Sequence, residues 1–106
     1  MILIGDIGNS DTKICLVNSN YKIVKRLVLP TKKISKIFLK KKLNFIIKNK
    51  IFIKKSLFCS VVPSQFLLIK SFIKKNLKSK CIELKSLNLN KFMKIKVTEN
   101  KLALTG

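Results

Sequence analysis

The sequence contains no histidine, and only 4 of its 106 residues are acidic. The lack of histidine excludes a histidine-based catalytic triad and a histidine-ligated metal site. Cysteine is also scarce, and Cys15, Cys59 and Cys81 are widely spaced and odd in number. This spacing argues against a disulfide framework or a zinc site. We expect three reduced thiols that pack as small apolar side chains.

Long hydrophobic runs are missing as well. The longest stretch without a charged residue, residues 56–69, is interrupted by Pro63 and is too short to span a bilayer. The amino-terminal apolar run has no basic leader and stops at Asp6, so it does not resemble a signal peptide. These features predict a cytoplasmic protein without a membrane partner.

Basic residues, in contrast, are abundant. Lysine and arginine number 24, which gives a formal net charge of +20, and such a balance is typical of proteins that bind nucleic acid or anionic membranes. However, Arg26 is the only arginine, and the lysines are scattered among many Ile, Asn and Phe residues, a mixture that AT-rich codons favour. The longest run, residues 40–42, lies in an apolar-periodic segment and fits a solvated helix face. A nucleic-acid partner therefore stays open as the less favoured interpretation.

The apolar pattern predicts one α/β domain. Residues 1–4, 14–17 and 21–29 read as three strands of a meander. Residues 31–48 read as a helix with Thr31 as its cap, residues 57–62 as a buried strand that Pro63 ends, and residues 80–85 as a last strand. A second helix would begin at Ser64, with a buried face formed by Phe66, Ile69, Ile73 and Leu77. This order predicts a mixed sheet with flanking helices.

The segment of residues 5–13 holds two of the three glycines and two of the four acidic residues. It joins two apolar runs and so reads as a polar turn between strands. Glycine lets the backbone approach a ligand, and successive N–H groups in a tight turn can converge on a phosphate. Asp6, at the strand end, could hold a metal ion or its water. An ordinary hairpin loop has a similar composition, and Lys13 could be a solvated strand-end residue, so both alternatives stay open.

Two motifs resemble those of type III pantothenate kinases. The family's first phosphate-binding motif is close to DIGNT followed by NTK, and this chain reads Asp6, Ile7, Gly8, Asn9, Ser10, Asp11, Thr12 and Lys13. Residues 56–64 resemble the strand of that family that ends in SSVVPS. The wider superfamily of sugar kinases, actin and Hsp70 chaperones shares the first motif loosely, whereas the second is characteristic of the pantothenate kinase branch.

This resemblance implies a kinase that transfers the γ-phosphate of ATP to pantothenate in the first step of coenzyme A synthesis. It also implies Mg²⁺, a monovalent cation (K⁺ or NH₄⁺), a homodimer, and a pair of ribonuclease-H-like domains with the active site between them. Residues 1–102 would form the first, ATP-binding domain. Asp6 would orient Mg²⁺ and its water, residues 8–12 would offer backbone N–H groups to the phosphates, and Thr12 and Lys13 would add a hydroxyl and a positive charge. A Walker GxxxxGK[ST] pattern is absent from the sequence.

The resemblance ends near the carboxy terminus. The family continues into a segment close to YDNPxEVGxDR, whose Asp is the proposed catalytic base, but residues 94–106 contain no GxDR. One added base before the codons of residues 103–106 could restore Gly-Ser-Asp-Arg, so we expect either a frameshift at about Leu102 or a truncation. With no catalytic residue matched and the second domain absent, the chain alone is predicted to be inactive. A small basic protein that binds nucleotides or nucleic acid without catalysis is the alternative.

Overall fold

The structure, a computed structural model, describes residues 1–84. Their elements, in chain order, are β1 (Ile2–Ile7), β2 (Asp11–Val17), β3 (Ile23–Pro30), the 3₁₀-helix η1 (Thr31–Lys33), α1 (Lys36–Lys42), α2 (Asn44–Lys48), β4 (Lys55–Ser60), α3 (Pro63–Phe72), the π-helix η2 (Ile73–Leu77) and β5 (Cys81–Glu83).

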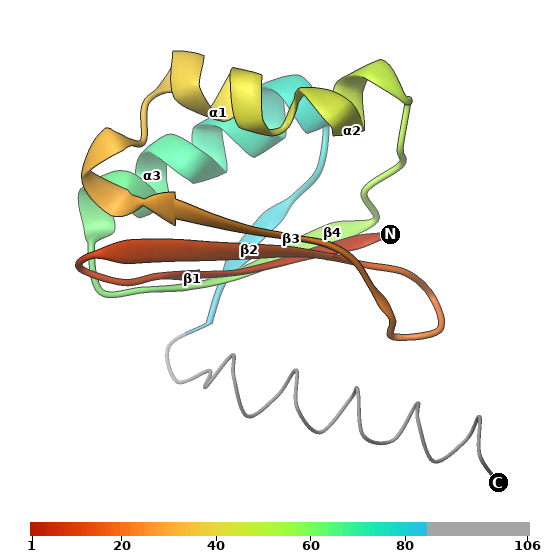
Figure 1. Cartoon of the computed structure of the whole chain (residues 1–106), viewed down its shortest axis with the longest axis horizontal. Helices are drawn as coiled ribbons and strands as arrows, with labels where there is room; N and C mark the ends of the chain where they lie inside the picture. The colour runs from red at the N-terminus through yellow and green to blue at the C-terminus, as the bar shows by residue number, and fades with distance from the viewer. Residues whose placement is uncertain (85–106) are drawn as a thin grey trace, which may run out of the picture.

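The five strands form one mixed sheet in the order β3-β2-β1-β4-β5. The first three strands are an antiparallel meander, whereas β4 runs parallel to β1 and β5 runs parallel to β4. Parallel neighbours need long crossover connections, and here helices supply them. α1, α2 and α3 all lie on the same face of the sheet (Figure 1). The predicted mixed sheet with an amino-terminal meander and helices is confirmed.

Alternation along the strands divides their side chains between the two faces of the sheet. On the helix side, strand residues pack with helix residues in the main core cluster, whose members include Leu3, Ile7, Ile14, Leu16, Phe58, Leu39, Ile46, Phe66, Ile69 and Ile73. On the other face, Ile4, Cys15 and Val17 form a smaller buried cluster. Burial of this apolar surface is the main force that holds the helices on the sheet.

The prediction of one helix over residues 31–48 is wrong. The segment divides into η1, α1 and α2, because Ile34 is extended (φ −68°, ψ 122°) and Leu43 leaves helical geometry (φ −101°, ψ 10°). Thr31 does not cap the long helix. Instead, the Ser35 hydroxyl accepts a hydrogen bond from the Phe38 N–H at 3.1 Å at the start of α1. Apolar periodicity continues across these breaks, so it could not reveal them.

The second half of the fold follows the sequence pattern more closely. Phe66, Ile69 and Ile73 are buried along α3 and η2, and Leu77 packs against the same core. The strand predicted over 57–62 is shifted, because β4 ends at Ser60 and Val61 is exposed.

The last predicted strand, 80–85, is observed as β5. The proposed domain end at residue 102, the tail of residues 103–106 and the absent GxDR motif lie outside the described residues.

The three cysteines are free thiols; Cys15 and Cys81 are buried, as expected, whereas Cys59 is partly exposed. Within residues 1–84, no helix has the length and apolar character that crossing a bilayer requires.

Candidate functional site

The loop between β1 and β2 is shorter than the glycine-bearing turn that the sequence predicted. β1 extends to Ile7 and β2 begins at Asp11, so the loop consists of residues 8–10. Gly5 and Asp6 are strand residues, and Asp6 lies directly opposite Lys13 in the antiparallel register. The predicted site residues are therefore brought together at one hairpin, partly on its strands and partly on its loop.

The second motif reaches the same end of the sheet, where β1 and β4 both finish. β4 is parallel to β1, and their last residues, Ile7 and Ser60, are paired. The Val61 N–H then donates to the Ile7 carbonyl at 3.1 Å, and α3 begins at Pro63. The connection from β4 to α3 thus lies beside the β1–β2 loop (Figure 1). Parallel pairing explains why two motifs fifty residues apart in the sequence form one site.

Hydrogen bonds within the protein hold most of the loop's carbonyl groups. The Gly8 N–H donates to the Asp11 carbonyl at 3.0 Å. The Thr31 hydroxyl donates to the Gly8 carbonyl at 2.8 Å, and the Thr31 N–H donates to the Ser10 carbonyl at 2.9 Å. Among residues 1–84, no partner is found for the N–H groups of Asn9 and Ser10, both of which are exposed. Two adjacent donors are therefore free for an anion or for water.

Sequence reasoning missed Thr31 and Gln65 as parts of this site. The Gln65 side-chain amide, from the first turn of α3, donates to the Thr31 carbonyl at 2.7 Å. Thr31 thereby connects the start of α3 to the loop. No local pattern could have revealed this link, because the bond joins residues 34 positions apart.

Thr12 has a different place from the one expected. Its side chain is fully buried, and its hydroxyl lies 2.8 Å from that of Thr31. Since the single hydroxyl proton of Thr31 goes to the Gly8 carbonyl, Thr12 must be the donor in this pair. The result is a chain of hydrogen bonds from Thr12 through Thr31 to Gly8. The Thr12 hydroxyl supports the loop from inside.

The two glycines of the hairpin serve different purposes. A side chain at position 5 would overlap the buried Phe58 ring, so Gly5 allows β1 and that ring to pack closely. At position 8, a Cβ would lie 3.0 Å from the Asp11 carbonyl oxygen, which is tighter than ordinary van der Waals contact. Only Gly8 therefore belongs to the loop where a ligand could approach the backbone.

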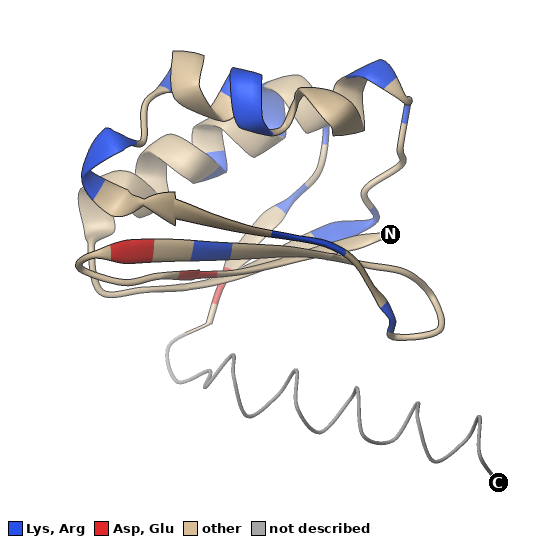
Figure 2. Cartoon of the chain, viewed as in Figure 1, with Lys and Arg blue, Asp and Glu red and all other residues tan. Residues whose placement is uncertain are grey.

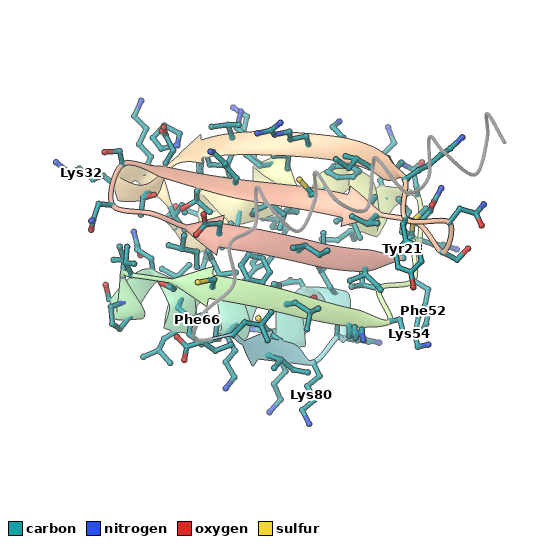
Figure 3. All side chains as sticks on the ribbon, turned by 90° about the horizontal axis from the view of Figure 1, so that it is seen from below. Tyr21, Lys32, Phe52, Lys54, Phe66 and Lys80 are labelled. Carbon is teal, nitrogen blue, oxygen red and sulfur yellow. The ribbon has the colours of Figure 1, made fainter. Side chains whose placement is uncertain are left out.

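Asp6 and Lys13 bring opposite charges to the sheet face that is turned away from the helices, since each lies two residues along its strand from a member of the smaller cluster, Ile4 or Cys15. Two of the three acidic residues in the described part, Asp6 and Asp11, lie at this hairpin, whereas basic residues are distributed over strands and helices (Figure 2). Lys32 lies at the same end of the sheet, and Tyr21 and Lys54 lie at the other end (Figure 3).

A protein-only metal cage is not formed by the described residues, because no three His, Cys, Asp or Glu side chains in residues 1–84 gather closely enough to hold an ion. Mg²⁺, however, is commonly bound through one or two carboxylates together with waters and substrate phosphates. Asp6 is half-buried and two residues from the loop, which suits this mode of binding.

Comparison with protein families assigns the chain to a family. Residues 2–103 match the family model of type III pantothenate kinase. The chain belongs to the type III pantothenate kinase family. The matched region includes both stretches that resemble the family's motifs, residues 6–13 and 56–64. These two stretches meet at one end of the sheet.

One curated relative agrees with this assignment. The chain is 59% identical over 98 residues to the type III pantothenate kinase of Pelagibacter ubique (strain HTCC1062). That match covers 92% of this chain but 39% of the relative, so the chain spans about two fifths of the length of this curated kinase.

A solved structure, the proposed N-acetylglucosamine kinase of Porphyromonas gingivalis, superposes with a TM-score of 0.57 at 22% identity. It covers 78% of this chain and 33% of that protein. This likeness shows the fold, a ribonuclease-H-like domain.

Proposed function

We propose that this chain is the ATP-phosphate-binding part of a type III pantothenate kinase, which transfers the ATP γ-phosphate to pantothenate in the first step of coenzyme A biosynthesis. The observation that supports the proposal is the pattern of hydrogen bonds in the β1–β2 loop. Protein donors occupy the carbonyls of Ile7, Gly8 and Ser10, while the N–H groups of Asn9 and Ser10 have no partner among residues 1–84 and can bind a ligand. Fixed N–H groups of this kind stabilise anionic oxygens because they need no reorganisation when the charge arrives.

The residues of the hairpin take distinct roles in this proposal. Asn9 and Ser10 bind phosphate oxygens through their backbone, and Gly8 keeps the approach open. Lys13 adds a positive charge from β2, and Ile7 and Asp11 hold the two ends of the loop through their carbonyls. Phosphoryl transfer depends mainly on position and charge neutralisation, so such contacts contribute directly to the reaction.

Asp6 is the residue that we propose for Mg²⁺, through a bound water. When bound, the ion supplies positive charge that neutralises the phosphate oxygens. We assign the monovalent cation, K⁺ or NH₄⁺, the pantothenate contacts and the catalytic base to the length of the relative that this chain does not span. A cytoplasmic homodimer completes the proposal and is supported by family membership alone.

A polypeptide of residues 1–106 should bind Mg·ATP without phosphorylating pantothenate. The match covers 39% of the curated kinase, and none of the described acidic residues other than Asp6 and Asp11 lies at the hairpin. Turnover of pantothenate by the purified chain, followed as ADP release, would contradict this expectation.

The test is a titration of ¹⁵N-labelled chain with Mg·ATP, followed by NMR. We expect saturable shifts concentrated at the amides of Asn9 and Ser10, and weaker affinity in Asp6→Asn. Glu83→Gln is the matched control, because it removes the same charge from β5 at the edge of the sheet. Equal effects of the two substitutions, or shifts that do not saturate, would overturn the proposal. Asp6-independent binding of nucleic acid, lost at high salt, would favour the basic binding protein instead.

A further inference from the structure

Thr31 is the most heavily hydrogen-bonded residue near the loop, although it belongs to neither motif. It stands where β3 passes into η1 and is almost completely buried. Its N–H and hydroxyl both donate to the loop, to the carbonyls of Ser10 and Gly8. Its carbonyl accepts from the Gln65 side chain, and its hydroxyl oxygen accepts from Thr12. Every polar group of Thr31 therefore has a partner at the site, and its carbonyl also accepts from the Ile34 N–H at 3.2 Å.

These bonds decide which polar groups the loop presents. Thr31 holds the carbonyls on either side of Asn9, those of Gly8 and Ser10, toward the protein interior. With both carbonyls fixed, the peptide groups between them cannot rotate freely, and no residue in the described range 1–84 bonds the N–H groups of Asn9 and Ser10. A loop released from Thr31 could turn a carbonyl toward the ligand, where its negative end would repel phosphate.

We propose that Thr31 is a positioning residue for nucleotide phosphates, and that Gln65 positions Thr31 in turn. The inference rests on the proposed function, because it assigns the loop a phosphate ligand. Gln65 is the residue directly after the SSVVPS-like segment, so the first turn of α3 is linked to the loop through Thr31. The chain of hydrogen bonds from Thr12 through Thr31 to Gly8 strengthens this action, since linked bonds polarise one another.

Removal of the Thr31 hydroxyl tests the inference. Thr31→Val keeps the shape of the side chain but leaves the Gly8 carbonyl and the Thr12 hydroxyl without their partner. We expect its affinity for Mg·ATP to fall roughly tenfold, the effect of losing one well-formed hydrogen bond. Thr31→Ser retains the hydroxyl and should bind nearly as well as the original chain. Gln65→Met removes only the bond to the Thr31 carbonyl, and its affinity for Mg·ATP should lie between those of Thr31→Val and Thr31→Ser.

A matched control separates positioning from loss of stability. Ser56 and Ser79 form another buried pair of hydroxyls, 3.4 Å apart, at the end of β4 that is remote from the loop. Ser79→Ala should lower the urea midpoint as Thr31→Val does, yet leave the affinity for Mg·ATP unchanged. Hydrogen exchange supplies a second readout, because the Gly8 amide, bonded to Asp11, should exchange faster in Thr31→Val than in Ser79→Ala.

The outcomes distinguish this inference from the proposed function. If the original chain binds Mg·ATP and Thr31→Val binds it equally well, Thr31 has no positioning role, while the proposed function stands. Equal losses of affinity in Thr31→Val and Ser79→Ala would also overturn the positioning role of Thr31, because both losses would then reflect reduced stability alone. If the original chain does not bind Mg·ATP, the proposed function fails and the inference fails with it.

Discussion

The Phe58 ring occupies the space in which any residue other than glycine at position 5 would place its Cβ. The two residues are direct neighbours in the parallel pairing of β1 with β4. Phe58 is fully buried and belongs to the main core cluster, on the side of the sheet that the helices cover. Gly5 therefore lets a large aromatic ring lie against the strand that leads to the candidate phosphate loop.

Gly5→Ala should destabilise the chain by about 2–3 kcal/mol, as expected when a tightly packed core must accept an extra methyl group. The Phe58 ring cannot move away easily because it is enclosed on all sides. Urea denaturation followed by circular dichroism measures the change. Phe58→Leu in the same chain should recover part of the loss, since the smaller side chain leaves room for the methyl group.

Gly8→Ala is the comparison for that prediction. Its Cβ would meet only the Asp11 carbonyl oxygen, at an exposed loop. We expect a smaller loss of stability than in Gly5→Ala but a weaker affinity for Mg·ATP. If Gly5→Ala were as stable as the original chain, the packing account of Gly5 would be wrong.

The sequence located the first two strands because the apolar runs 1–4 and 14–17 are buried in the sheet, but it missed that β1 continues to Ile7 and that β2 begins at Asp11. It predicted the second helix because Phe66, Ile69 and Ile73 recur at helical spacing. It failed over residues 31–48, where apolar spacing is continuous although the backbone is not. The breaks there depend on single hydrogen bonds, such as that of Ser35, which periodicity does not record.

The candidate site was predictable in part. Composition alone drew attention to residues 5–13, because glycine and acidic residues are so rare elsewhere in the chain. The division of roles within that segment was not visible, since the burial of Gly5 and Thr12 depends on partners far along the sequence, Phe58 and Thr31. Long-range contacts of this kind come from the tertiary fold, and a local motif cannot encode them.

Ser35→Ala should lower the free energy of unfolding by about 1 kcal/mol, the usual effect of removing an N-cap side chain. The Phe38 N–H would then lose its partner in the first turn of α1. Ser71→Ala, at an exposed position in α3, is the control and should have almost no effect. Thermal unfolding of both variants measures the difference. Equal melting temperatures for the two would show that the Ser35 cap contributes nothing to stability.

Binding of single-stranded RNA should be weak and should disappear as salt rises, because the basic residues among residues 1–84 are spread over strands, helices and loops (Figure 2). Asp6→Asn should leave that binding unchanged, although it weakens the binding of Mg·ATP. Fluorescence anisotropy with a labelled oligonucleotide at low and physiological salt tests both statements. Tight RNA binding that persists at physiological salt would favour the nucleic-acid alternative.

The stability of the chain should fall between pH 9 and about pH 11 in part through Cys81. Burial raises the pKa of this thiol from 9.0 to about 11, while nearby Lys70 lowers it and Glu83 raises it. In this pH range the unfolded thiol loses its proton and the folded thiol keeps it, so the folded state binds more protons. Stability must then decrease as the pH rises. The same direction holds for Cys15, whose pKa is also raised by burial.

Cys81→Ala isolates this contribution, because the variant has no thiol to titrate at that position. Its stability at pH 8 should be lower than that of the original chain, since a buried side chain has been shortened. The gap should narrow between pH 8 and pH 10.5, as the original chain alone loses the contribution of the protonated thiol. Urea denaturation at the two pH values measures the gap, and a constant gap would mean that Cys81 ionises as readily in the folded chain as in the unfolded one.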